Sequence, residues 1–305
     1  MKILVLDNVD SSAIEILKKN NFDVDVKNNL SNQDLENIIS NYDVLIVRSQ
    51  TKVTKSVIEK GKNLKIIARA GVGLDNIDVN SAKEKNIKVI NSPSGNTISA
   101  AEHTLGLILA ISRNIAFADK SMKEGKWERN KFVGYELNNK TLGIIGFGKI
   151  GSHLAKICKV IGMNILAYDP YIKNLEDEKM KLVSFDDVIQ NSDYITLHLP
   201  LTEETKNLIN IEIFRKMKKS AILINCSRGG IVNEDDLYIA LKENIIKGAA
   251  LDVFENEPLK DSKLIELGNK ILLTPHLGAS TYEAQINVAI DVANQIVELS
   301  KEYYV

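Results

Sequence analysis

The chain contains 305 residues, carries a formal net charge of −1 and has two cysteines. A chain of this length predicts two domains, each able to bury a core, and its near-neutral charge argues against nucleic acid or an anionic membrane as a partner. Neither a transmembrane segment nor a secretion signal is evident, so we expect a soluble protein of the cytoplasm. Cys158 and Cys226 lack C-x-x-C and histidine spacing, which argues against a disulfide framework and a metal site.

Short β-branched runs alternate with helical patterns over the first part of the chain. Strands are predicted at residues 2–7, 22–26, 43–49, 65–71 and 87–93, separated by helical stretches such as 11–20, 31–40 and 54–61. This alternation predicts a parallel sheet with helices on both faces.

A second series of strands follows a long apolar helix predicted at about 97–115. Its strands are predicted at 141–146, 164–169, 193–200, 221–227, 247–253 and 270–276, and a last helix at about 280–301. The last helix comes after the second sheet is complete, so we expect it to cross back onto the first. The predicted domains are therefore residues 1–96 with 280–305, and residues 97–279, with a hinge at the helices that begin near Thr97 and Ser280.

Residues 141–169 read as a strand, a glycine turn, an amphipathic helix and a second strand. Gly146 permits a tight turn, Gly148 allows close approach of a pyrophosphate, and Gly151 allows the helix to pack closely on the strand. The helix opens on Lys149 and Ile150, and its free N–H groups favour an anion. The segment therefore predicts a dinucleotide-binding unit, although a lone glycine motif of this kind also marks ordinary turns.

Asp169 ends the second strand of this unit. Its spacing from the glycines is that of a carboxylate that bonds both ribose hydroxyls, and its charge would repel a 2′-phosphate. The sequence therefore favours NAD over NADP.

Three charged or titratable residues follow three strands in succession. Arg228 precedes two glycines, Glu257 lies in a loop before a proline, and His276 lies between a strand and the last helix. Taken singly, they could be a surface ion pair, a solvated acid and a capping or core histidine. Together they predict a hydride-transfer site, in which the arginine holds a substrate carboxylate, the histidine moves a hydroxyl proton and the glutamate orients and charges the histidine.

Almost the whole chain resembles the D-isomer-specific 2-hydroxyacid dehydrogenases. The segments that carry the resemblance are VRSQTKVT, ARAGVGLDNID, NSPSGNTISAAEHT, SMKEGKWERNKFVGYELNNKTLGIIGFGKIG, NCSRGGIVNEDDL, GAALDVFENEP and PHLGAST. The GKWER segment, with KF soon after, is similar to the members that oxidise 3-phosphoglycerate, the first step of serine synthesis. The resemblance implies an α/β fold of two doubly wound parallel-sheet domains, a flavodoxin-like substrate domain and a Rossmann NAD-binding domain. It also implies a short form without the serine-binding regulatory domain of longer members.

The resemblance assigns roles to individual residues. Catalysis falls to Arg228, Glu257 and His276: neutral His276 takes the C2 hydroxyl proton as hydride leaves C2 for the nicotinamide. Beyond the glycine motif, NAD contacts fall on Lys149, Ile150, Asp169, Cys226, Ser227, Arg228, Asp252, His276, Gly278 and Ala279. Substrate contacts fall on Arg48, Arg69, Gly71, Val72 and Asn96, with Arg129 reaching across from a partner subunit. Val72 stands where close relatives often have threonine, and Leu199 replaces a hydroxyl residue near the adenosine side.

Arg48 and Arg69 end neighbouring strands of the first sheet and predict a positive pocket for the phosphate of 3-phosphoglycerate. Each alone could be a solvated surface arginine. A glyoxylate, hydroxypyruvate or D-lactate reductase would share the cofactor motif and the catalytic trio, but its substrate needs no basic cluster. A third possibility is an NAD-sensing protein like the corepressors that use this fold.

The apolar helix at 97–115 also predicts a homodimer formed through the cofactor domain. It is apolar over too much of its surface to pack on one side only, and residues 121–132, which follow it, have no evident core of their own. The alternative is a helix packed wholly within one subunit.

Overall fold

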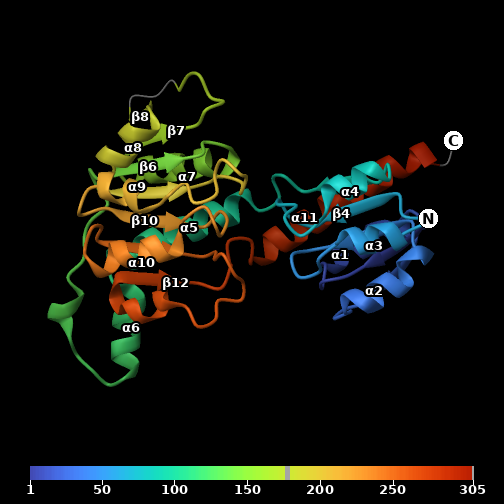
Figure 1. Ribbon diagram of the computed structural model, residues 1–305, viewed down its shortest axis with the longest axis horizontal. Helices are drawn as coiled ribbons and strands as arrows, with labels where there is room; N and C mark the ends of the chain where they lie inside the picture. Colours follow the sequence, from blue (N-terminus) through green and yellow to red (C-terminus); the bar gives the residue numbers. More distant parts are fainter. Residues whose placement is uncertain (176–178, 304–305) are drawn as a thin grey trace. The chain divides into compact units, whose positions relative to one another are not determined.

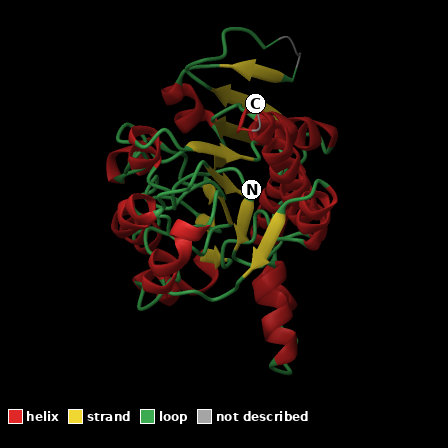
Figure 2. Ribbon diagram, turned by 90° about the vertical axis from the view of Figure 1, so that its right-hand side faces the viewer, coloured by secondary structure: helices red, strands yellow, loops and turns green. Residues whose placement is uncertain are grey.

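Two parallel sheets organise the chain in a computed structural model that describes residues 1–175 and 179–303 (Figure 1). The chain divides into two compact units, Met1–Asn96 with Ala279–Val305, and Thr97–Gly278. The predicted α/β class with two doubly wound parallel sheets is confirmed. Helices lie to either side of the strands in Figure 2.

The first unit contains a five-stranded parallel sheet in the order β2-β1-β3-β4-β5, the flavodoxin-like order. The strands are β1 (Lys2–Val5), β2 (Asp23–Val26), β3 (Val44–Val47), β4 (Ile66–Arg69) and β5 (Lys88–Asn91). The helices are α1 (Ser11–Lys19), α2 (Asn32–Ile38), α3 (Lys55–Lys60), α4 (Val79–Glu84) and α11 (Tyr282–Ser300), with short 3₁₀ turns at η1 (Ile39–Asn41) and η4 (Lys301–Tyr303).

Alternating side chains of this sheet supply two cores, because successive residues of a strand point to opposite faces. Ile3 and Val5 of β1 pack with α1 and α11, whereas Leu4 packs on the other face with α2, α3 and α4. The last helix, α11, thus lies beside α1 on the first sheet. Side chains that accept N–H bonds from the first turn begin these helices: Asp10, Ser31, Thr54, Asp78 and Thr281.

The second unit contains a seven-stranded parallel sheet in the order β12-β11-β10-β9-β6-β7-β8. Its strands are β6 (Thr141–Ile145), β7 (Asn164–Tyr168), β8 (Met180–Leu182), β9 (Tyr194–Leu197), β10 (Ile222–Asn225), β11 (Gly248–Leu251) and β12 (Ile271–Leu273). Its helices are α5 (Thr97–Ser112), α6 (Ile115–Lys123), α7 (Lys149–Val160), α8 (Phe185–Asn191), α9 (Ile211–Lys216) and α10 (Glu234–Lys242), with η2 (Arg129–Phe132) and η3 (Lys263–Lys270). The order is that of a Rossmann sheet extended by one strand, and it reverses between β6 and β9.

The central strands β9, β10 and β11 are buried along their whole length. Helices α8, α9 and α10 cover one face of the sheet, and α5 and α7 cover the other. Burial on both faces accounts for the continuous apolar runs that predicted these strands.

The structure corrects the expected end of one helix and adds one strand that the sequence did not predict. The helix predicted to run to residue 115 ends at Ser112, because the Ser112 carbonyl accepts a bond from the Tyr135 amide (2.9 Å) and Asn114 adopts a left-handed conformation (φ 55°). A new helix, α6, starts at Ile115. The edge strand β8 was not predicted, because three residues are too few to show a period.

Candidate active site

The glycine turn between β6 and α7 lies at the point where the second sheet reverses its strand order. Gly146 has φ 92°, and a Cβ there would lie 2.4 Å from the carbonyl oxygen of His198. A Cβ on Gly151 would lie 2.3 Å from the Gly146 carbonyl oxygen, so both positions require glycine. Gly148 caps α7 without a side-chain bond and faces open space. The N-terminus of α7 is therefore accessible to an anion.

Asp169 follows β7 directly and lies beside the glycine turn. Its Oδ2 accepts the Phe147 amide (2.9 Å) and its Oδ1 accepts the Tyr171 amide (2.9 Å). A carboxylate offers about four acceptor positions, so two remain for a pair of hydroxyls. Together with the turn and the open N-terminus of α7, this arrangement fits the diphosphate and ribose of a dinucleotide.

The three predicted catalytic residues follow three adjacent strands. β10 pairs with β11 and β11 with β12, in a register that places Asn225 beside Leu251 and Leu251 beside Leu273. Because the strands are parallel, the loops that carry Arg228, Glu257 and His276 leave the same edge of the sheet.

The Arg228 loop is a tight turn built on Asn225. The Asn225 Oδ1 accepts the Ser227 amide (3.0 Å) and hydroxyl (2.8 Å), and its Nδ2 donates to the Arg228 carbonyl (2.9 Å). The Arg228 Nη1 donates to the Ser227 carbonyl (2.7 Å). A Cβ on Gly229 would lie 1.8 Å from the Phe254 carbonyl oxygen, so the arginine loop packs directly on the loop that carries Glu257.

His276 and Glu257 are in direct contact. The His276 Nδ1 lies 2.7 Å from the Glu257 Oε2, and the Glu257 Oε1 accepts the Phe254 amide (3.1 Å). Burial acts to raise the pKa of Glu257, but the hydrogen bond and charge of His276 outweigh it, and the pKa is lowered. The ionised carboxylate keeps the proton of neutral His276 on Nδ1, so Nε2 is left as the atom that can take a proton.

Asp252 holds the loop that carries His276. Its side chain is fully buried, and it accepts bonds from the Thr274 hydroxyl (2.6 Å) and from the amides of Leu277 (2.8 Å) and Gly278 (2.8 Å). Burial acts to raise the pKa of Asp252, but these bonds and His103 lower it overall. The structure thus gives Asp252 a positioning role, and its expected contact with a cofactor stays a prediction.

Sequence reasoning missed two histidines in this unit. His103, on α5, has its Nε2 3.1 Å from the Asp252 Oδ1, and only the folding of α5 onto β10, β11 and β12 brings the two together. His198 lies next to the glycine turn, and burial lowers its pKa to about 4, so its imidazole is neutral. Its position at the end of a predicted strand could have identified it. Burial also raises the pKa of Cys226 to about 12, which keeps that thiol neutral.

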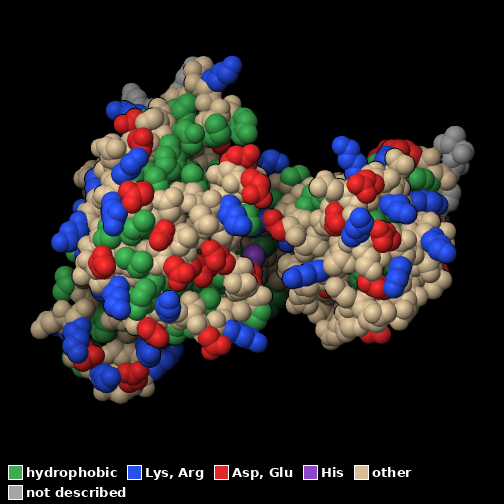
Figure 3. Space-filling model, in the orientation of Figure 1, with side chains coloured by type: hydrophobic (Ala, Val, Ile, Leu, Met, Phe, Trp, Pro, Cys, Tyr) green, Lys and Arg blue, Asp and Glu red, His purple; other side chains and the backbone are tan. Residues whose placement is uncertain are grey.

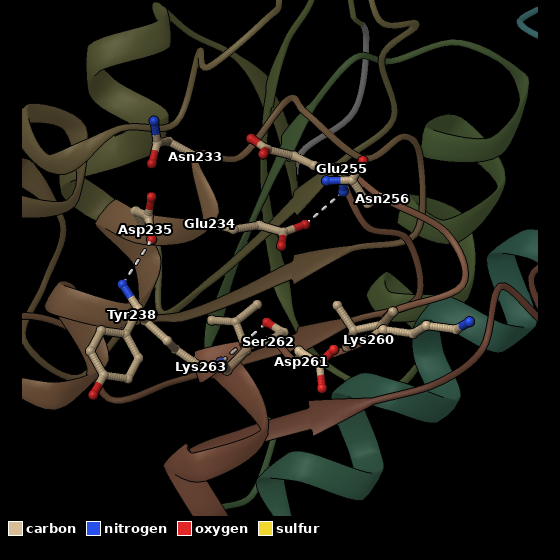
Figure 4. A pocket seen from close by; sticks show the side chains of 12 residues that line it. Asn233, Glu234, Asp235, Tyr238, Glu255, Asn256, Lys260, Asp261, Ser262 and Lys263 are labelled. Atoms are coloured by element: carbon tan, nitrogen blue, oxygen red, sulfur yellow. Dashed lines mark hydrogen bonds and ion pairs between the residues drawn. The ribbon is translucent and has the colours of Figure 1, made fainter.

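A surface pocket adjoins the loop that leads to Glu257 (Figure 4). Glu234, the first residue of α10, accepts the Glu255 amide through its Oε1 (2.6 Å). Burial and the nearby carboxylates of Glu255, Asp235 and Glu257 raise the pKa of Glu234. This bond ties the loop to α10, and the pocket itself does not include the catalytic trio.

In the first unit, Arg48 and Arg69 come from neighbouring strand ends. Arg69 ends β4 opposite Val47, and Arg48 follows Val47 directly. The Arg69 guanidinium lies over Gly71, where a Cβ would be 2.7 Å from its Nη1. Val72 offers its carbonyl to Asn91.

The turn that carries Arg48 is held by two side chains that sequence reasoning did not single out. Asp7, after β1, accepts the amides of Arg48 (2.9 Å) and Thr51 (3.0 Å), and Asn76 donates to the carbonyls of Arg48 (2.8 Å) and Thr51 (2.7 Å). The strand order of the first sheet reverses between β1 and β3, which is where open sheets bind ligands. Asn96 has a buried Oδ1 without a hydrogen-bond partner among residues 1–175 and 179–303.

Arg129 lies exposed on η2, on the segment that joins α6 to β6. This segment also exposes Trp127 (76%) and Val133 (77%). Within the described part of the chain, no group of three or more His, Cys, Asp or Glu residues could hold a metal ion, and none of its helices has the length and apolarity needed to cross a bilayer.

Comparison with known proteins agrees with this arrangement. Residues 105–278 match the model of the D-isomer specific 2-hydroxyacid dehydrogenase, NAD binding domain. The chain belongs to the D-isomer specific 2-hydroxyacid dehydrogenase family. Residues 105–278 are therefore the family's NAD-binding domain, which confirms NAD as the cofactor.

Individual relatives narrow the comparison. A D-3-phosphoglycerate dehydrogenase of Synechocystis is 53% identical over 97% of this chain and 53% of the relative. A hydroxypyruvate reductase of Thermotoga maritima is 48% identical over 97% of both chains. A solved NAD-bound 3-phosphoglycerate dehydrogenase of Entamoeba histolytica has a TM-score of 0.84 at 32% identity, covering 99% of this chain and 95% of that one. The chain spans 53% to 58% of the length of the first three curated phosphoglycerate dehydrogenases that it matches.

Proposed function

We propose that the chain oxidises D-3-phosphoglycerate to 3-phosphooxypyruvate with NAD, the first step of L-serine synthesis, and that it does so in the cytoplasm. The observation that carries the proposal is the 2.7 Å contact of His276 with Glu257, in a unit that belongs to the family's NAD-binding domains. The phosphoglycerate dehydrogenases among the relatives and the paired strand-end arginines, Arg48 and Arg69, favour a phosphorylated substrate.

The N-terminus of α7 would hold the diphosphate of NAD, and Asp169 would bond its ribose. NAD supplies the acceptor for the substrate hydride when it is bound. His276 takes the C2 hydroxyl proton on Nε2, and Glu257 stabilises the imidazolium that results. Arg228 binds the substrate carboxylate through two parallel bonds. Cys226, Ser227, Gly278 and Ala279 would line the NAD site.

The enzyme would distinguish 3-phosphoglycerate from unphosphorylated 2-hydroxy acids by binding the substrate phosphate. Arg48 and Arg69, with Gly71, Val72 and Asn96, would bind the part of the substrate distant from C2. Arg129 would be contributed by the partner subunit of a homodimer formed through the cofactor domain. Exposed apolar side chains of that domain, such as Met122 and Trp127, would contact the other copy.

A hydroxypyruvate reductase is the second candidate, because the Thermotoga relative with that name is 48% identical over 97% of its length. Steady-state rates with 3-phosphoglycerate, D-glycerate and D-lactate, each with NAD and with NADP, distinguish the candidates. We expect the highest kcat/KM with 3-phosphoglycerate and NAD. Faster turnover of D-glycerate would favour the reductase, and NAD binding without turnover of any substrate would favour a sensor protein.

A further inference from the structure

The loop at 274–278 is held in place by side chains from elsewhere in the second unit. Asp252 accepts the amides of Leu277 and Gly278, and Ser99 donates its hydroxyl to the Gly278 carbonyl (2.7 Å). His276 itself has φ 56°, a left-handed conformation that is uncommon for residues other than glycine. The position of the imidazole therefore depends on these bonds.

Helix α5 supplies two of the side chains that hold this loop. Ser99 and His103 are four residues apart and so lie on one face of the helix. The His103 Nε2 lies 3.1 Å from the Asp252 Oδ1 and 3.3 Å from the Thr274 Oγ1. Because Thr274 gives its hydroxyl hydrogen to Asp252, the Nε2 faces two acceptors and must carry a hydrogen.

We propose that Ser99 and His103 are positioning residues for His276, a role that rests on the function proposed above. Ser99 acts through the Gly278 carbonyl, and His103 acts through the buried carboxylate of Asp252. Loss of either bond would let the loop relax towards an ordinary backbone conformation and move the imidazole relative to Glu257. A displacement of about 1 Å in a reacting group can reduce turnover about a hundredfold.

The buried carboxylate of Asp252 needs the donors that surround it. Asp252 has no exposed surface, so its charge depends on the donors around it. Its Oδ1 has three neighbours that can donate, Thr274, Leu277 and His103, and two of the three belong to the histidine loop. His103 is the donor that comes from α5, so it joins the carboxylate to the helix.

Matched serine variants test the role of Ser99. Ser99→Ala and Ser112→Ala remove the same buried hydroxyl from the same helix, but Ser112 bonds to Tyr194 (2.9 Å) and does not contact the histidine loop. We expect Ser99→Ala to lower kcat about ten- to a hundredfold, and Ser112→Ala to keep the wild-type kcat. Equal kcat values in the two variants would overturn the role of Ser99.

His103→Leu and His103→Gln test the second contact. Leucine removes the donor, whereas the glutamine amide can reach Asp252 in place of Nε2. We expect kcat to fall about tenfold or more in His103→Leu and to recover most of its value in His103→Gln, with similar thermal unfolding midpoints for the two variants. Wild-type turnover in His103→Leu, or equal losses in both variants, would overturn the role of His103.

Amide hydrogen exchange tests the loop without using activity. We expect the amides of Leu277 and Gly278 to exchange at least about tenfold faster in Ser99→Ala and His103→Leu than in the wild type or in Ser112→Ala. Unchanged exchange would overturn the proposal even if turnover falls. If the amides exchange faster in these two variants but the wild-type protein turns over no 2-hydroxy acid, the role of Ser99 and His103 in holding the loop is supported. The proposed function is then refuted instead.

Discussion

His276 depends on Glu257 for its tautomer. The 2.7 Å contact joins Nδ1 to the carboxylate, and the pKa of Glu257 is the result of opposed effects. Burial raises it, while the hydrogen bond and charge of His276 lower it further than burial raises it. The contact with His276 therefore favours the ionised form of Glu257.

The first prediction removes that partner. In His276→Ala, we expect kcat to fall about 100- to 10,000-fold, because the general base is lost, while NAD affinity stays near the wild-type value. The pKa of Glu257 should rise, since burial then acts with less opposition. Kinetics and an NMR titration of the Glu257 carboxyl measure the two effects. Wild-type turnover would contradict the role of His276, and an unmoved Glu257 titration would contradict the contact.

Asp169 carries the second prediction. Asp169→Ala should weaken NAD binding by about 1.5–3 kcal/mol for each charge-assisted bond lost, and should reduce the preference for NAD over NADP. Asp169→Asn serves as the control, because its amide oxygen can still accept the Phe147 amide. Isothermal titration with both cofactors measures the change. Equal affinity of the wild type for NAD and NADP would show that Asp169 does not select the cofactor.

At the scale of elements, the turn after β3 presents Arg48 because Asp7 and Asn76 bond its amides and carbonyls. The turn is thereby fixed by one residue after β1 and one after β4. The position of Arg48, and with it any contact of Arg48 with the substrate, therefore depends on Asp7 and Asn76.

The third prediction concerns substrate selectivity. Arg48→Ala should lower kcat/KM with 3-phosphoglycerate about 10- to 100-fold and change the slow reaction of D-glycerate little, because only the phosphorylated substrate needs the charge. Asp7→Asn should give a smaller loss with the same selectivity. Lys55→Ala removes a positive charge from an exposed side chain of α3 and should change neither rate. Equal losses on both substrates would assign Arg48 a structural role.

The fourth prediction concerns Asp252, which holds the loop that carries His276, and the pH dependence of folding stability. The folded pKa of Asp252 is lowered from 3.8, so its contribution to stability is fully present above that value and is lost as the pH falls through the folded pKa. Asp252→Asn should therefore be less stable than the wild type at neutral pH, and the difference should shrink as the pH falls below 3.8. Urea midpoints measured from neutral to acid pH test this. A constant difference over the whole range would show that the charge of Asp252 contributes nothing.

At the scale of the whole molecule, opposite charges are interspersed over the face shown in Figure 3, consistent with the net charge of −1. The exposed apolar side chains of the segment between α6 and β6 contrast with this surface. Large exposed apolar groups on one segment favour contact with another protein surface.

The fifth prediction concerns the homodimer. Light scattering at micromolar concentration should give the mass of a dimer, and Val133→Lys should shift it towards a monomer, because a charge would be buried in the contact. Val160→Lys is the matched control, since Val160 is also highly exposed (86%, against 77% for Val133) but lies at the end of α7. A monomeric wild type would refute the dimer and the role of Arg129 across it.

The sequence alone was sufficient for the two parallel sheets, the glycine turn and the placement of Arg228, Glu257 and His276 after successive strands. These features depend on short-range spacing and on the period of apolar residues, which are visible in a single chain. The roles of the three residues stay predictions, although the structure brings Glu257 and His276 into contact.

Only the tertiary structure decided how the histidine loop is held and where α5 ends. Ser99 bonds to Gly278, 179 residues later, and the Tyr135 amide ends α5 at Ser112. Such contacts depend on where the chain returns after a long excursion. The local pattern of apolar residues does not predict such contacts. A serine or histidine that will contact a distant loop has the same local pattern as one that faces solvent.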